Sequence, residues 1–324
     1  MAPRRTVSLT FAVMFPLLAV GSQSQQQTAS DEPLKLSTEL VIVDAQVLNK
    51  KSGAVVGGLP LADFTLYEDG TKQQVTHFSQ DKLPLSIVLL LDVSGSVMPI
   101  INRVRDEGLV ALDQLKPNDE IAVMVFGKWA DLFQDFTKDR QLVAKRIGDI
   151  RWIGPWIQEG THIHEAVYQA ARHLTTASNP GSRRVIIIVT DNMSNQPMAL
   201  PHSQSEAMAS LLESGVSLFG LVVGDFSALA RDYLAKGWIL SDSIGNYVNE
   251  TGGVAVQIDK DDAIAKLTAL IERLRTRYSF GYTSRNQKRD GKFRRITLKV
   301  SPEVENREGG ISIIARAGYY APRR

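Results

Sequence analysis

The chain has 324 residues, of which 44% are hydrophobic and 22% charged, so it is long enough for about two globular domains and is neither disordered nor fibrous. Lys and Arg total 37 against 35 Asp and Glu, and this near-neutral balance offers no broad positive surface for nucleic acid or an anionic membrane. Cysteine is absent, which excludes disulfide bonds and thiolate metal sites.

Residues 1–21 predict an export signal. A basic start at Arg4 and Arg5 is followed by an apolar run over residues 7–20, which is shorter than the roughly 20 residues that a membrane-spanning helix needs. Small residues precede the expected cleavage after Gly21. We therefore expect an exported bacterial protein, periplasmic or secreted, without a transmembrane span once the signal is removed. An uncleaved signal and a buried N-terminal helix are the alternatives.

Two β-rich segments are expected on either side of a longer central region. Residues 22–36 are polar and predict a flexible lead-in. In the N-terminal β segment, residues 37–82, we expect two strands around a Lys-Ser-Gly turn and two more around Asp69-Gly70. The C-terminal β segment, residues 277–324, contains three further strand-like stretches. The two segments form either the halves of one β-sandwich or two separate appendages.

Residues 84–276 alternate between apolar strands and amphipathic helices. This alternation predicts an α/β fold, a doubly wound and mainly parallel sheet with helices on both faces. Strands are expected at 85–94, 121–127, 130–137, 183–191 and 217–224, and helices at 101–115, 164–174, 205–215 and 262–278.

Oxygen-bearing side chains gather where these strands end, which is where open α/β sheets bind ligands. Asp92, Ser94 and Ser96 follow the first central strand, Asp191 follows the strand at 183–191, and Thr161 precedes the helix near residue 164. An all-oxygen set suits one hard divalent cation, Mg²⁺ or alternatively Mn²⁺ or Ca²⁺. Because hydroxyls coordinate without neutralising the ion, it would retain attraction for an Asp or Glu of a partner protein.

This pattern resembles a known family. The run Asp-Val-Ser-Gly-Ser at 92–96, with Thr161 and Thr190-Asp191, is similar to the metal-ion-dependent adhesion site of the von Willebrand factor A domain, across residues 84–276. The resemblance implies a Rossmann-like fold and a non-enzymatic binding module. It also implies that Thr161 binds the ion directly when a partner is bound, and that Asp191 binds it directly or through water.

The fuller chain resembles exported von Willebrand A proteins typical of acidobacteria, which implies a cell-envelope or secreted binding module with no known ligand. The stretches that carry this likeness are Gly58-Leu59, Asp63-Phe64, Glu68–Gly70, Glu250–Gly253 and Arg316–Ala321.

Some positions depart from the family pattern. Asn192 stands where a glycine commonly follows the aspartate, and this leaves the ligand itself intact. Met98 and Pro99 occupy positions that are acidic in integrin β-type domains, so we expect no adjacent second metal site. In integrin-like relatives the last helix shifts on binding, and the sequence leaves open whether residues 262–278 do so.

Other interpretations compete with the metal site. Asp92 and Ser96 are also residue types that cap helices, here one beginning near Pro99. A serine of this loop with His162 or His164 and Asp191 imitates a hydrolase triad, although the Gly-x-Ser-x-Gly pattern is absent. His162, His164 and Glu165 together hint at zinc, without the usual His-Glu-x-x-His spacing.

Three further features are ambiguous in the sequence. The basic stretch 285–295 is either a charged hairpin or a contact for an anionic surface. Trp129, Trp152 and Trp156 belong either to the core or to the rim of a binding face. The polar loop 192–203 lies next to Asp191, a position from which loops often set specificity.

From these observations we expect an exported, non-enzymatic module that binds a partner protein through one divalent cation and has no catalytic residues. One competing hypothesis is a structural assembly subunit of the envelope whose metal only stabilises the fold. The other is a metal-assisted hydrolase.

Overall fold

The structure, a computed structural model, describes residues 40–80, 83–152, 160–179, 181–193, 202–224 and 243–323. The expected export signal and lead-in lie outside these residues. None of the helices within the described ranges has the length and apolar character to cross a membrane.

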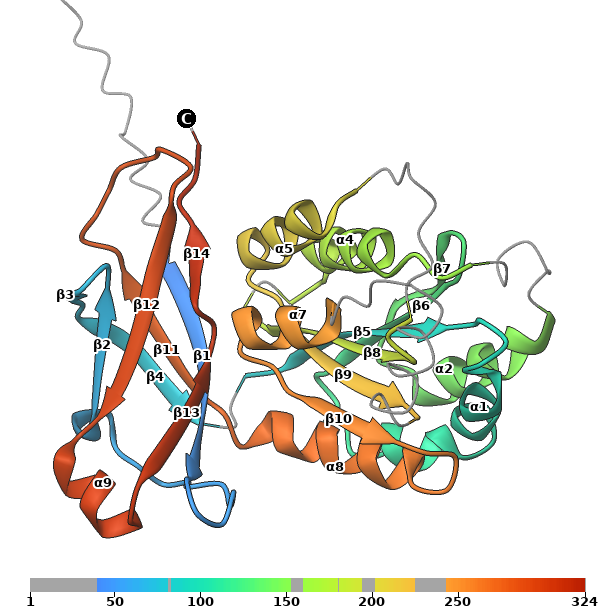
Figure 1. Ribbon diagram of the computed structural model, residues 1–324, viewed down its shortest axis with the longest axis horizontal. Helices are drawn as coiled ribbons and strands as arrows, with labels where there is room; N and C mark the ends of the chain where they lie inside the picture. Colours follow the sequence, from blue (N-terminus) through green and yellow to red (C-terminus); the bar gives the residue numbers. More distant parts are fainter. Residues whose placement is uncertain are drawn as a thin grey trace, which may run out of the picture. The chain divides into compact units, whose positions relative to one another are not determined.

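A six-stranded sheet forms the centre of the α/β region (Figure 1), in the order β10-β9-β8-β5-β6-β7. All neighbours run parallel except β6 and β7, which are antiparallel. Every residue of β5 is buried, as expected for a strand covered on both faces. The predicted mainly parallel fold is confirmed. The strands are β5 (Leu85–Asp92), β6 (Glu120–Phe126), β7 (Ala130–Thr137), β8 (Arg183–Thr190), β9 (Ser217–Val223) and β10 (Ala255–Ile258).

Helices cover both faces of this sheet, and each face has its own apolar core. Helices α1, α2 and α8 pack on one face through residues such as Val104, Ile147 and Leu270. Helices α4, α5 and α7 cover the other, with Val167 and Leu211 in its core. The helices are α1 (Met98–Leu112), α2 (Arg140–Gly148), α4 (Ile163–His173), α5 (Gln204–Glu213), α7 (Ser243–Thr251) and α8 (Ala263–Arg275). Short 3-10 turns lie at Asp149–Trp152 and Leu174–Thr176 in this region and at Leu61–Asp63 in the N-terminal β segment.

Three elements of this region, α2, α7 and β10, were not predicted. The α7 sequence contains glycine, two asparagines and β-branched residues, which have weak helix propensity. Its buried Ile244, Tyr247 and Val248 join the core beneath it. Tertiary contacts therefore stabilise a helix that local propensity does not indicate.

The two β segments combine into two four-stranded sheets, β13-β1-β11-β4 and β14-β12-β2-β3. Both sheets contain strands from both ends of the chain, and Val43, Leu66, Phe280 and Leu298 share one core. In sequence, the α/β region is thus inserted between strands that pair with one another. The elements are β1 (Leu40–Asn49), β2 (Phe64–Glu68), β3 (Thr71–Lys72), β4 (Val75–Gln80), β11 (Tyr278–Thr283), β12 (Phe293–Val300), α9 (Pro302–Glu308), β13 (Ile311–Ala315) and β14 (Gly318–Tyr320).

Three expected strands differ from the structure. The single strand expected after the Asp69-Gly70 turn is two strands in the structure. Strand β3 pairs with β2, whereas β4 crosses to the other sheet and pairs with β11. The C-terminal stretch 311–320 divides in the same way into β13 and β14. Around the Lys-Ser-Gly turn only an isolated bridge joins Leu48 to Val55. One extended segment cannot pair in two sheets, so the chain bends where it changes sheet.

The Glu250–Gly253 stretch joins the two regions. The Glu250 carbonyl accepts from the Ala317 N–H at 2.9 Å, and the Gly252 carbonyl accepts from Arg277 Nη2 at 2.8 Å. Gly253 lies so close to β9 that a Cβ there would be 1.7 Å from the Leu218 carbonyl oxygen. In this chain the stretch therefore has a structural role.

Candidate metal centre

The site begins at the carboxyl end of β5, the central strand of the six-stranded sheet. Asp92 is its last residue and is fully buried. The Ser94 N–H donates to Asp92 Oδ1 at 3.0 Å, and the Val93 N–H donates to the Phe126 carbonyl at 2.9 Å. These bonds turn the chain away from the sheet and fix the Asp92 carboxylate at its edge.

The neighbouring strand β8 brings Asp191 to the same place. Ser96 Oγ donates to Asp191 Oδ2 at 2.6 Å, and Ser94 Oγ lies 3.2 Å from Ser96 Oγ. Thr190 Oγ1, which the sequence did not single out as a contact, donates to Asp92 Oδ2 at 2.8 Å. Four of the five predicted ligands are thus joined in one hydrogen-bonded group, which opens to solvent at the exposed Ser96.

Thr161, the fifth predicted ligand, is buried just before α4 at the same edge of the sheet. The N–H of the next residue, His162, donates to the Gly127 carbonyl at 2.9 Å. This bond joins the Thr161 loop to the turn after β6, the strand adjacent to β5.

Asn192 adopts φ of +58°, in the left-handed region that Asn enters more readily than most residues. Its N–H donates to Thr190 Oγ1 at 3.1 Å, and its Oδ1 accepts from the Ile244 N–H at 3.2 Å. The departure from glycine at this position is therefore compatible with the turn, and the Met193 N–H still donates to Asp191 Oδ1 at 3.0 Å.

The electrostatics of the site favour a cation. Burial, and then the charge of Asp191, raise the pKa of Asp92 to about 7. No Lys, Arg or His of the described residues forms an ion pair with either carboxylate. The described residues also contain no group of three His, Asp or Glu side chains placed to hold a metal. Two carboxylates and nearby hydroxyls fit one hard divalent cation, which would offset their repulsion.

Helix capping does not account for these residues. Helix α1 begins at Met98, its N-cap is Val97, and no side chain caps it. Asp92 and Ser96 instead bond within the group formed with Thr190 and Asp191. The capping interpretation is wrong.

The two histidines near Thr161 are engaged elsewhere. His164 Nδ1 lies 2.9 Å from the Tyr247 hydroxyl, and burial lowers the pKa of both His162 and His164. Glu165 accepts from Gln169 at 2.7 Å and lies 2.6 Å from His202 Nδ1. These contacts favour neither the hydrolase triad nor the zinc cluster. The Tyr247 contact had no signal in the sequence, because the helix that carries it was not predicted.

The structure describes some of the three features that were ambiguous in the sequence. Trp129 is 51% exposed and belongs to the turn after β6, beside the Thr161 loop. The side chains of Trp152 and Trp156 lie outside the described residues, and so does most of the loop 192–203. In the basic stretch, Arg294 is buried and pairs with Asp290 at 2.8 Å. That stretch is therefore at least partly structural.

Comparison with known proteins identifies a domain in the chain. Residues 87–194 match the family model for the von Willebrand factor type A domain. This match includes the loops of Asp92, Thr161 and Asp191. No curated protein matches the full sequence.

Several solved structures are similar to part of this chain. BatB from Bacteroides thetaiotaomicron is 19% identical, with a TM-score of 0.45, and the match covers 59% of this chain and 97% of that one. Proximal thread matrix protein 1 from the mussel byssus, with a zinc-occupied MIDAS motif, is 18% identical, with a TM-score of 0.45 over 60% of this chain and 48% of that one. Manganese-loaded TRAP from Plasmodium vivax is 15% identical, with a TM-score of 0.41 over 74% and 82%.

Proposed function

Since the chain contains a von Willebrand factor type A domain, we propose that it is an exported binding module that docks a partner protein through a divalent cation. The proposed ligands of that ion are Asp92, Ser94, Ser96, Thr161 and Asp191. The partner contributes an Asp or Glu side chain. We propose no catalytic residues and no nucleic-acid partner.

The observation that carries this proposal is the hydrogen-bonded group at the ends of β5 and β8. Two carboxylates, Asp92 and Asp191, lie close enough for the charge of Asp191 to raise the pKa of Asp92, and the described groups that hydrogen-bond to them are hydroxyls and backbone amides. Because three of the five proposed ligands are neutral hydroxyls, the ion is neutralised less than in a site made only of carboxylates and can still attract a further carboxylate. Trp129, exposed on the adjacent turn, provides an apolar contact beside that point.

The preferred ion is Mg²⁺, with Mn²⁺ and Ca²⁺ as alternatives. The export signal expected at residues 1–21 is the basis for proposing a periplasmic or secreted location. A structural assembly subunit, in which the ion only stabilises the fold, is the second candidate, because a cation that offsets buried repulsion also stabilises the domain. The contacts of His164 and Glu165 make a hydrolase the least favoured.

Cation binding is expected to raise the melting temperature of the chain from Ser22 onward. At a concentration about 100 times its Kd, a cation stabilises the folded state by about 2.7 kcal/mol. For a domain of this size that corresponds to roughly 5–10 °C in Tm. Thermal unfolding in EDTA and then in Mg²⁺, Mn²⁺ or Ca²⁺ measures the shift, and Asp92→Ala should show none. A shift of equal size in Asp92→Ala would place the ion elsewhere.

Docking itself is tested by affinity capture from envelope extracts of the organism that makes the protein. A partner bound through the ion should be retained by the wild type in Mg²⁺, and lost both in EDTA and with Asp92→Ala. If wild type and variant retain the same partner equally, the metal-bridged mechanism is wrong and the assembly subunit is favoured.

A further inference from the structure

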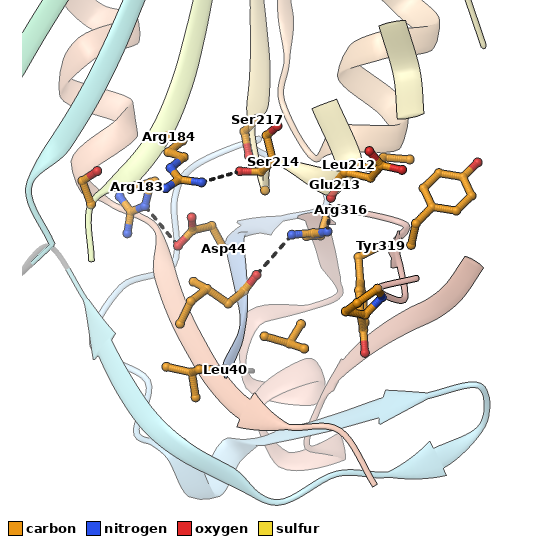
Figure 2. A pocket seen from close by; sticks show the side chains of 16 residues that line it. Leu40, Asp44, Arg183, Arg184, Leu212, Glu213, Ser214, Ser217, Arg316 and Tyr319 are labelled. Carbon is orange, nitrogen blue, oxygen red and sulfur yellow. Dashed lines mark hydrogen bonds and ion pairs between the residues drawn. The ribbon is translucent and has the colours of Figure 1, made fainter. Parts of the chain in front are cut away.

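A second pocket lies away from the candidate metal centre. It has a volume of about 310 Å³, within the range of ligand sites, and is bounded by the first half of β1, the end of α5 and the C-terminal residues from Arg316 onward (Figure 2). None of the proposed metal ligands lines it. Any ligand here is therefore independent of the cation.

One wall of the pocket is an unpaired strand edge. Strand β1 pairs with β11 over Leu40–Ala45 but with β13 only over Ala45–Asn49, because the chain leaves for β14 after β13. On the β13 side, none of the described strands pairs with Leu40–Asp44.

The direction of the backbone at this edge follows from two contacts. The Ile42 carbonyl accepts from Arg316 Nη1 at 3.4 Å, and the Asp44 carbonyl accepts from Arg277 Nη2 at 3.0 Å. In an antiparallel strand the N–H and C=O of one residue point to the same side. The N–H groups of Leu40 and Ile42 therefore face the open edge, whereas those of Val41 and Val43 face β11. At Asp44 the buried Arg277 side chain already occupies that edge.

Two arginines of the pocket have no carboxylate as an ion-pair partner among the described residues. Arg183 is paired with Asp44 at 3.0 Å, but Arg184 donates only to the Ser214 carbonyl at 3.0 Å (Figure 2). Arg316 donates only to carbonyls, at 2.8 Å to Gly318, 2.9 Å to Leu212 and 3.4 Å to Ile42. Among the described residues, no Asp or Glu forms an ion pair with either arginine.

Both arginines converge on the end of α5, since they donate to carbonyls only two residues apart. Those carbonyls supply partial negative charge, less than one carboxylate would. The Nε of Arg184 is buried without a hydrogen-bond partner in the described structure. Burial lowers the pKa of Arg316 to about 10, which leaves it charged at neutral pH. Glu213, at the rim, is exposed and pairs with neither.

The edge is also apolar. Leu40 and Ile42 are 43% and 38% exposed, and both line the pocket, as does Tyr319. An unpaired strand edge with exposed apolar side chains is a template for pairing with another extended chain.

We propose that an extended segment of a partner protein adds as a strand along Leu40–Ile42 and places an Asp or Glu side chain against Arg184 and Arg316. The added strand satisfies the N–H groups of Leu40 and Ile42. Its carboxylate replaces the long contact between Arg316 and the Ile42 carbonyl and supplies the missing negative charge.

The test uses three capped, fluorescently labelled heptapeptides of alternating Val and Thr, with Glu, Gln or Lys at the centre. Binding to the chain from Ser22 onward is measured by anisotropy in EDTA, so that a cation site plays no part. We expect the Glu peptide to bind at least ten-fold more tightly than the Gln peptide, and the Lys peptide most weakly. Equal affinities, or no binding by any peptide at millimolar concentration, would overturn the proposal.

Variants locate the effect. Arg184→Gln should reduce the preference for Glu over Gln to less than three-fold, Arg184→Lys should keep most of it, and Arg307→Gln, at an exposed ion pair on α9, should leave it unchanged. Thermal unfolding checks that each variant is folded. If Arg184→Gln instead converts a dimer of the protein alone into a monomer, the occupant is a second copy and the proposal is wrong.

Hydrogen exchange tests the strand pairing separately from charge. The Glu peptide should slow amide exchange at Leu40 and Ile42 and leave Val41 and Val43, which face β11, unchanged. Protection confined to other parts of the chain would overturn the proposed geometry even if the peptide binds.

Discussion

Replacing Asp92 by Asn is expected to stabilise the cation-free protein at pH 8 by about 2 kcal/mol and to abolish its response to Mg²⁺. Asp92 is fully buried, and burial together with Asp191 raises its pKa from 3.8 to about 7. That difference corresponds to about 4 kcal/mol. The hydrogen bonds from the Ser94 N–H and the Thr190 hydroxyl, which favour the carboxylate, are weakened in the variant and reduce the gain.

The stability that Asp92→Asn gains over the wild type is expected to increase with pH. Because the folded-state pKa of Asp92 lies above its unfolded value, its ionisation weakens the folded state, and the wild type loses stability as pH rises from about 4 to about 7. The variant should therefore gain most at pH 8, less at pH 5 and nothing below about pH 4. Urea denaturation of both proteins in EDTA at these pH values measures the difference between their free energies of unfolding. The ionisation of the other carboxyl groups affects both proteins alike and cancels in this difference.

Saturating Mg²⁺ should reverse the order of stability. At about 1,000 times its Kd the ion stabilises the wild type by about 4.1 kcal/mol and leaves Asp92→Asn unchanged. A variant that is less stable than the wild type in EDTA at pH 8 would show that Asp92 is held by favourable contacts rather than strained by repulsion, and would contradict the proposed cation site.

Asp119 provides the matched control, because it is an equally buried aspartate with its charge balanced. It accepts from the N–H groups of Leu85 and Lys116 at 2.8 and 2.6 Å and forms an ion pair with Arg275. Asp119→Asn leaves the arginine without its partner and should cost about 3–5 kcal/mol, with or without Mg²⁺. The two substitutions are chemically identical and should have opposite signs in EDTA.

Gly253→Ala is expected to destabilise the protein by about 4 kcal/mol or to prevent folding. The added Cβ would lie 1.7 Å from the carbonyl oxygen and 2.7 Å from the carbonyl carbon of Leu218, which belongs to β9. Backbone atoms of a central strand cannot move aside as a flexible side chain can. The adjacent contact, in which the Leu218 N–H donates to Thr251 Oγ1 at 3.0 Å, would be lost with it.

Soluble yield and urea denaturation followed by circular dichroism measure this loss. Gly148→Ala, at the end of α2, is the control, because no atom lies within 4 Å of the added Cβ. That change should be neutral or stabilising by up to about 1 kcal/mol, as expected for Ala in a helix. A loss below about 1 kcal/mol for Gly253→Ala would contradict the close contact between Gly253, which follows α7, and β9.

The central sheet could be predicted because its strands are continuous apolar runs, as in β5 and β8, and its longer helices have clear periodicity. Helix α7 could not, since burial of Ile244 and Tyr247 stabilises it. The change of sheet between β3 and β4 was also hidden, because both strands follow the Asp69-Gly70 turn, which predicts a simple hairpin. Local sequence indicates whether a segment forms a strand or a helix. Which sheet a strand joins depends on strands that are distant in the sequence.

For the candidate metal centre, the residue types and the edge of the sheet could be predicted from the loops that follow β5 and β8. The individual contacts could not. Ser96 and Asp191 are 95 positions apart, and only the fold shows that their side chains are joined by a hydrogen bond. The role of Thr190 as a donor to Asp92 was hidden for the same reason. The metal ligands themselves, Thr161 included, stay a prediction.

The insertion of the α/β region between paired strands fixes an order of events during synthesis. Among the described strands, β1 and β4 have no partner before β11, which begins at Tyr278. About 200 residues separate β4 from β11, and at roughly 5–20 residues per second the ribosome needs about 10–40 s to make them. In that interval the six-stranded sheet can be completed, whereas β1 and β4 wait unpaired. The flank that is translated first is therefore the last to acquire its sheet.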